Sequence, residues 1–403
     1  MYLERPQRRA ASLVRIIVLI GLIGAGAIIL SRSGEGNKPA TPTPAATRTA
    51  TSYIADAEAA TRAGRLDDAI LAYRVALTLE PDNPAIAPPL VRLMIYQSQG
   101  RKERLTEALR LAQRAARITP ESAPVQAALA LALDWNGETL EAIYAGRAAI
   151  QLDPNYAEGY AFLAEAYADG KNWLRAMDAA ETARKLNPNS IDAHRANGYV
   201  LESQGRYGEA LAHYQRALEL APNVAFLYHT IARTYSNLGN YDAAIKQYER
   251  ALELEPGRAD TQDEMGWTYY QRYILYGRSI DLESSIKELS QATENNPEYA
   301  PAWAHLGFAY YRRRDYENTI TALGKAIELG GDKIENYYTL GLAHFYMDQC
   351  NLAMPLFQKA LSMDPNDPNA HGGINLCLGV TATPLPPTPR PRPTSTPRPT
   401  PAP

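Results

Sequence analysis

Small and apolar residues recur along this 403-residue chain with a fixed period of about 34 residues, a length typical of repeat architectures. The stretch Ala210–Pro222 returns in nearly the same form as Ala244–Pro256. The intervals between successive closing prolines from Pro120 to Pro256 are equal, and the interval from Pro297 to Pro365 is twice as long. A fixed period in an alanine-rich, helix-forming background predicts a stack of similar helical units. The closing prolines are Pro81, Pro120, Pro154, Pro188, Pro222, Pro256, Pro297 and Pro365.

Each residue type in the clearest unit has a steric role. Gly198 and Ala210 are small, so the two helices that carry them can approach closely where they cross. Tyr214 fills the remaining space, and Gly205 ends the first helix in a left-handed cap. Pro222 ends the second helix. The pattern therefore predicts one antiparallel helix pair for each period.

This spacing resembles the tetratricopeptide repeat family. The resemblance implies an all-α fold, a right-handed superhelical α-solenoid of helix hairpins, over residues 52–380. We expect nine units and then a solvating helix over Ala370–Leu378 that caps the last apolar face. The second unit carries about three extra residues at 101–104, and the seventh carries seven around Tyr273–Gly277. The units are expected to end near Asn83, Glu121, Asn155, Asn189, Asn223, Gly257, Glu298, Lys333 and Asn366.

Residues 13–30 form an apolar run with one internal charge, preceded by a basic segment at 1–12. At about 18 residues the run is just long enough to span a bilayer, and the basic flank predicts a cytoplasmic amino end. We therefore expect a transmembrane signal anchor in a single-pass protein with extracytoplasmic repeats. The alternative is secretion after cleavage at Ala25–Ala27. Gly21 and Ala25 form a small-xxx-small pair that would allow a weak homodimer.

Two segments have no hydrophobic periodicity. Residues 31–51 are rich in Gly, Ala, Thr and Pro, which predicts a flexible linker. Residues 381–403 are almost exclusively Pro, Thr and Arg, which predicts a disordered tail of polyproline II character. The tail could be an inert spacer or a ligand for a proline-binding partner.

Charge is unevenly distributed along the chain. The formal net charge is −3, but residues 49–380 hold 31 basic and 42 acidic residues, a net charge of −11. Phosphate contacts need a basic face, so nucleic acid is not expected as a ligand.

The chain has only two cysteines, Cys350 and Cys377. In a hairpin stack they would lie at ends of adjacent antiparallel helices that meet, so a disulfide is one interpretation. Two buried, inert thiols are the other.

No catalytic or nucleotide-binding motif occurs in the repeats. The six histidines are scattered one to a helix, a spacing that offers no metal site. We therefore expect a protein that is not an enzyme and holds no cofactor or metal.

Recognition remains as the expected activity. In the tetratricopeptide repeat family the first helices of successive units line a concave groove, and residues at i, i+4 and i+7 form a stripe on each helix. The stripe becomes aromatic in the last three units, which suits a peptide segment. We predict a membrane-anchored scaffold that binds protein segments; alternatives are a chaperone or assembly factor for cell-surface proteins, or a carbohydrate-binding or enzyme-accessory solenoid. The predicted groove residues are Arg195, Tyr199, His229, Arg233, Trp267, Tyr270, Phe308, Tyr311, Tyr338 and Phe345.

Overall fold

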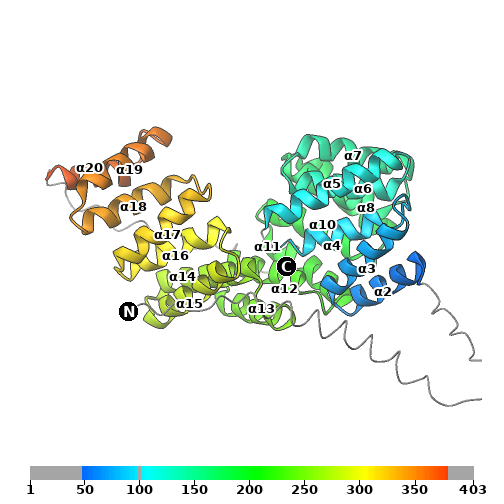
Figure 1. Cartoon of the computed structure of the whole chain (residues 1–403), viewed down its shortest axis with the longest axis horizontal. Coiled ribbons are helices and arrows are strands. Elements are labelled where there is room, and N and C mark those ends of the chain that lie inside the picture. The colour runs from blue at the N-terminus through cyan, green and yellow to red at the C-terminus, as the bar shows by residue number, and fades with distance from the viewer. Residues whose placement is uncertain (1–47, 99–100, 380–403) are drawn as a thin grey trace, which may run out of the picture. The chain divides into compact units, whose positions relative to one another are not determined.

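The computed structural model describes residues 48–98 and 101–379, which fold into 19 α-helices without any strand (Figure 1). Eighteen of these helices form nine successive pairs, and the last one, α20, is single. The predicted all-α solenoid is confirmed over this part of the chain. The pairs are α2 (Ala50–Arg62) with α3 (Leu66–Leu79), α4 (Ala87–Tyr96) with α5 (Lys102–Ile118), α6 (Ala123–Trp135) with α7 (Thr139–Leu152), α8 (Ala157–Asp169) with α9 (Trp173–Leu186), α10 (Ile191–Ser203) with α11 (Tyr207–Leu220), α12 (Ala225–Asn237) with α13 (Tyr241–Leu254), α14 (Ala259–Tyr276) with α15 (Ser279–Asn295), α16 (Ala300–Arg312) with α17 (Tyr316–Glu328), and α18 (Ile334–Tyr346) with α19 (Cys350–Met363).

Glycine and alanine allow close contact within each pair. A Cβ atom added to Gly198 of α10 would lie 2.5 Å from the ring of Tyr214 in α11. The same relation joins Gly341 to Phe357 in the ninth pair, where the distance would be 2.6 Å. Tyr214 and Phe357 are both fully buried. The residue types at these positions in the sequence are therefore dictated by packing within the pair.

The extra residues of the second and seventh units are helical. Residues 102–104 form the first turn of α5, which has 17 residues. Tyr273–Tyr276 extend α14 to 18 residues, and Gly277 then ends it in the left-handed region with a φ of 70°. Most of the extra residues of these two units thus lie in helices α5 and α14.

The last pair is joined covalently to the final helix, α20 (Pro368–Cys377). Cys350 begins α19 and Cys377 ends α20, and the two form a disulfide. Of the two interpretations of the cysteines, the structure has the disulfide. Gly373 of α20 packs on Phe357, where an added Cβ would lie 2.2 Å from the ring. This helix therefore covers the face of α19 that a tenth pair would otherwise cover.

Several predictions concern residues outside the described ranges. The anchor at 13–30, the Gly21/Ala25 contact, most of the linker at 31–51 and the tail at 381–403 are among them. The described end of the linker differs from its prediction, because α2 begins at Ala50 with Thr49 as its N-cap. Among the described helices, none has the length and apolar character required to cross a membrane.

We expect Gly198→Ala to lower the free energy of unfolding by about 1–3 kcal/mol, because the new methyl group would overlap the Tyr214 ring. Gly208→Ala is the matched control, since this glycine lies exposed in α11 with no atom within 4 Å of an added Cβ. It should stabilise the protein by up to about 1 kcal/mol through helix propensity. Urea unfolding followed by circular dichroism measures both changes, and equal effects at the two positions would contradict the packing role.

Candidate functional site

Side chains of the second unit reach across the inside of the solenoid to the fifth and sixth units. Tyr96 of α4 donates a hydrogen bond to Asp192 of α10 at 2.5 Å and accepts one from Nε of Arg195 at 2.9 Å. Arg92 pairs with Asp192 at 2.7 Å. The Tyr96 ring also stacks on Phe226 of α12, with centroids 5.0 Å apart. These contacts join α4 to helices that lie far along the chain from it, in the fifth and sixth units.

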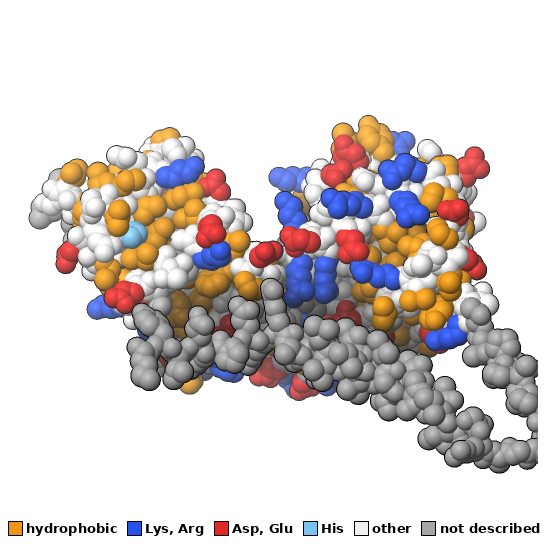
Figure 2. All heavy atoms as spheres, in the orientation of Figure 1, with side chains coloured by type: hydrophobic (Ala, Val, Ile, Leu, Met, Phe, Trp, Pro, Cys, Tyr) orange, Lys and Arg blue, Asp and Glu red, His pale blue; other side chains and the backbone are white. Residues whose placement is uncertain are grey.

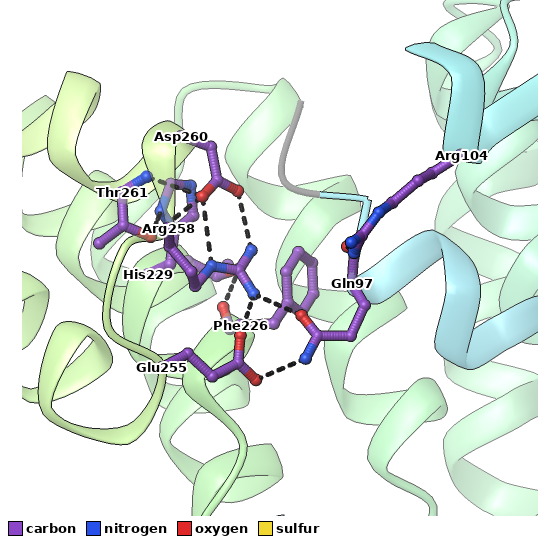
Figure 3. Close-up of polar contacts among 9 residues, drawn as sticks. Gln97, Arg104, Phe226, His229, Glu255, Arg258, Asp260 and Thr261 are labelled. Carbon is purple, nitrogen blue, oxygen red and sulfur yellow. Dashed lines mark hydrogen bonds and ion pairs between the residues drawn. The ribbon is translucent and has the colours of Figure 1, made fainter. Parts of the chain in front are cut away.

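A second set of contacts surrounds Arg258, whose side chain is 1% exposed (Figure 3). Its guanidinium pairs with Glu255 and with Asp260, each at 2.8 Å. It also donates to the side chain of Gln97, the C-cap residue of α4, at 3.2 Å, and Gln97 in turn donates to Glu255 at 2.9 Å. A charge can be buried this deeply only when it is paired and hydrogen-bonded, as this one is.

The bridging side chains border a cavity of about 350 Å³ on the inside of units two to seven. Its lining is both charged and aromatic, in contrast to the alanine-rich contacts within the pairs. The charged residues are Asp134, Glu165, Arg195, Arg233, Arg258, Asp260 and Glu264, and the aromatic residues are Tyr96, Trp135, Tyr199, Tyr214, Phe226 and Tyr299.

Two residues predicted to line an open groove are buried instead. Arg195 is 3% exposed and forms an ion pair with Glu165 of α8. His229 is 8% exposed and contacts the Thr261 hydroxyl through Nδ1 at 3.0 Å. Burial lowers the pKa of His229 to about 4, so the ring is neutral at pH 7. The expectation that Arg195 and His229 form an open groove is wrong, because side chains of α4 and the sixth and seventh units cover this part of the inner face.

Tyr199 and Arg233 line the same cavity and are half-buried. Tyr199 donates a hydrogen bond to Asp169, the last residue of α8. Arg233 pairs with Glu202 at 3.2 Å. The four predicted residues of the fifth and sixth units are therefore brought together, around a partly open cavity.

Predicted residues of the seventh and eighth units form a stack of rings. Trp267 of α14 stacks on Tyr270 with centroids 4.7 Å apart and on His305 of α16 with centroids 4.3 Å apart. Phe308 lies 6.3 Å from Trp267. Arg312 donates to the Tyr270 hydroxyl at 3.1 Å. All three predicted aromatic side chains remain partly exposed.

A second group of rings lies in the eighth and ninth units. Tyr346 of α18 stacks on Tyr316 with centroids 4.8 Å apart and lies 6.4 Å from Tyr311. Phe345 meets Tyr346 edge-on at 5.3 Å. Tyr338 is half-buried and packs against the small core around Ala360. We call Trp267, Tyr270, Phe308, Tyr311, Phe345 and Tyr346 the aromatic surface.

Figure 2 shows hydrophobic side chains gathered over the C-terminal helices, with charged side chains mainly around the edge of that area. Tyr346 is 49% exposed, although it is large and largely apolar. Apolar side chains grouped and exposed in this way are typical of interaction surfaces.

The imidazole ring of His305, a titratable group, stacks on Trp267 of the aromatic surface. His305 contacts Asp263 through Nδ1 at 2.7 Å, and Asp263 is 1% exposed. Burial disfavours the charged imidazolium, but the Asp263 charge and hydrogen bond outweigh it, so the pKa of His305 is raised above 6.5. Trp267 therefore stacks on a ring whose protonation is favoured by Asp263.

Several side chains of the site could not be predicted from the sequence. Tyr96, Phe226 and Arg258 contact partners whose positions depend on the curvature of the whole stack. His305 follows the predicted stripe residue Ala304 by one position, so a wider stripe would have included it. Within 48–98 and 101–379, no group of three histidine, cysteine or acidic side chains is placed to hold a metal ion.

Comparison with known proteins identifies the class. Two family models described as tetratricopeptide repeat match residues 189–256 and 334–367. A solved chain of the APC/C hetero-tetramer Cut9–Hcn1 is 18% identical, with a TM-score of 0.57, and the match covers 77% of this chain and 63% of that chain. The described part of the protein is therefore a helix-hairpin solenoid that contains tetratricopeptide repeats.

Two further solved structures are similar at lower scores. PilF of Pseudomonas aeruginosa is 15% identical with a TM-score of 0.48, and the match covers 54% of this chain and 96% of that one. The human IFIT1 dimer with m7Gppp-AAAA is 17% identical with a TM-score of 0.49, covering 75% and 69%. No curated protein matches the chain. At these identities the similarities show the fold alone.

The pH dependence of unfolding tests the burial of Asp134 in the cavity. Burial, then the charges of Asp169 and Glu165, raise its pKa to about 8, so folding favours the protonated form. The stability that Asp134 contributes is therefore present at low pH and is lost as the pH rises towards 8. Asn cannot ionise, so this loss is absent from Asp134→Asn. As the pH rises from 3.8 to about 8, the free energy of unfolding of Asp134→Asn should therefore increase relative to that of wild type by up to about 1.4 kcal/mol per pH unit.

Urea unfolding at pH 5, 7 and 9 measures this difference. Asp178→Asn is the control, because Asp178 is exposed on α9, and its difference from wild type should not change with pH. A pH-independent difference for Asp134→Asn would show that its carboxyl group is not protonated on folding.

Proposed function

We propose that the protein is a non-enzymatic scaffold, anchored in a membrane, that binds a peptide segment on its aromatic surface. Tetratricopeptide repeat proteins are generally non-enzymatic scaffolds, and the fold is that of the family. The observation that carries the proposal is two groups of rings, one around Trp267 and one around Tyr346, whose members remain at least partly exposed.

The chemistry of this surface favours a segment with proline or aromatic side chains. Trp267 and Tyr311 are partly exposed aromatic side chains, a type whose burial contributes much of the energy at protein interfaces. Arg312 is fixed by Tyr270 at the edge, where it can hydrogen-bond to backbone carbonyl groups of an extended segment. In units two to six, in contrast, side chains of the protein itself bridge the inner face and leave only the cavity between them.

The disulfide supports an extracytoplasmic location for the repeats. Disulfides persist in oxidising compartments and are rare in the cytosol. The bond between Cys350 and Cys377 is thus consistent with the topology that the basic and apolar N-terminal residues predict. The membrane anchor is proposed from the sequence of residues 13–30, which lie outside the described part of the chain.

We expect Trp267→Ala and Tyr311→Ala to weaken capture of the partner by about thirtyfold, because hot-spot residues of this type contribute about 2 kcal/mol or more. The measurement is crosslinked affinity capture from envelope extracts with the full-length protein, followed by titration of the captured partner. Tyr144→Ala is the matched control, since Tyr144 is 62% exposed on α7, away from the aromatic surface. Unchanged capture by both surface variants would refute the proposed site.

Topology is tested separately in intact cells. A membrane-impermeant protease should digest the repeats, and a maleimide should fail to label the cysteines until the cells are treated with a reductant. Protection of the repeats from the protease would overturn the extracytoplasmic placement without bearing on the peptide site.

A further inference from the structure

The cavity of units two to seven has a deficit of positive charge. Among residues that the structure describes, Asp134 and Glu264 line the cavity and make no hydrogen bond or ion pair through their carboxylates. Every arginine that lines the cavity is already paired: Arg195 with Glu165, Arg233 with Glu202, and Arg258 with Glu255 and Asp260. The unsatisfied groups are therefore acidic.

Asp134 is the more deeply buried of these two carboxylates. It is 6% exposed, and its Oδ1 atom is buried without a hydrogen-bond partner. It lies in the last turn of α6, and Asp169 is the last residue of the neighbouring α8. The C-terminal end of a helix carries partial negative charge, which disfavours a carboxylate and favours a cation at the same place. Two helix ends thus add to the negative potential here.

The surroundings of Asp134 also favour its protonated form. Burial and the charges of Asp169 and Glu165 raise the pKa of Asp134 to about 8, with only Arg195 opposing them. The other titratable group that interacts with it is Tyr199 on α10. A buried carboxyl group without a partner is costly when ionised, and a bound cation would remove that cost.

Aromatic rings surround the acidic group. Trp135 follows Asp134 in sequence and also lines the cavity, with its ring 6.0 Å from Phe226 and 6.3 Å from Tyr96. The Tyr96 ring already has the guanidinium of Arg195 at 4.9 Å. Trp is the side chain that attracts cations most strongly through its face, and among the described residues no arginine or lysine lies over the Trp135 ring. The cavity, at about 350 Å³, is within the range of small-ligand sites, about 300–1,000 Å³.

We propose that this cavity binds an alkylammonium or guanidinium group, with Asp134 as its counter-ion and the Trp135 ring as its wall. The group could be carried by a lysine or arginine side chain of a protein segment or by a free amine. The site is separate from the aromatic surface, and neither proposal depends on the other.

The experiment is calorimetric titration of the full-length protein with four probes at pH 7. N-acetyl-lysine methylamide represents a basic side chain in a protein, and cadaverine represents a free amine. N-acetyl-norleucine methylamide is the neutral near-isostere, and N-acetyl-glutamate methylamide is the anionic counterpart. We expect binding of one or both cations at least tenfold tighter than of the other two probes. Whether the lysine derivative or cadaverine binds more tightly then distinguishes the source.

Two variants locate the site. Asp134→Asn should weaken cation binding at least tenfold, whereas Asp178→Asn on the outer face of α9 should bind as wild type does. If Asp134→Asn does not fold, the titration of the wild-type protein with the four probes still tests the proposal. Since Asp134 is largely protonated at pH 7, cation binding should release a proton, detected by repeating the titration in buffers of different ionisation enthalpy.

The proposal is overturned by any of four results. These are no cation binding, equal binding of the norleucine derivative, preferential binding of the glutamate derivative, or a folded Asp134→Asn variant with wild-type affinity. Preference for the glutamate derivative would mean that the arginines of the cavity, rather than Asp134, recognise the ligand.

Discussion

The hydroxyl group of Tyr96 joins parts of the solenoid that are remote in sequence. It donates to Asp192 and accepts from Arg195, and the ring behind it stacks on Phe226. A stack of helix pairs otherwise has contacts only between neighbouring units, so each unit would be held by the two beside it. With this bridge the second unit also contacts the fifth and sixth. Whether side chains of the inner face are buried or exposed depends on this bridge.

Two different inner surfaces follow from this constraint. From the second to the sixth unit, side chains on the inner face form ion pairs and hydrogen bonds with one another. Between them lies a small cavity with charged walls. From the seventh to the ninth unit no such bridge occurs among the described residues, and the two groups of rings around Trp267 and Tyr346 remain partly exposed. A single fold therefore has a cavity with charged walls in one part and partly exposed rings in the other.

The helix pairs could be predicted from the sequence because their determinants are local. Gly198 and Tyr214 lie within one repeat, and the fixed period assigns both to the contact within one pair. The aromatic surface could be anticipated for the same reason, since Trp267 and Tyr270 lie on one helix face. The contacts of Tyr96 and Arg258 could not. They depend on the small rotation between successive units, which accumulates along the stack and has no signature in a single sequence. That is why Arg195 and His229 were assigned to an open groove.

The bridge between the second and fifth units is tested most directly by a double-mutant cycle of Tyr96→Phe and Asp192→Asn, with the free energy of unfolding as the readout. A buried hydrogen bond to a charged acceptor predicts a coupling energy of about 1.5–3 kcal/mol between the two positions. A coupling energy indistinguishable from zero would mean that the two side chains do not meet, and the account of the inner face would be wrong.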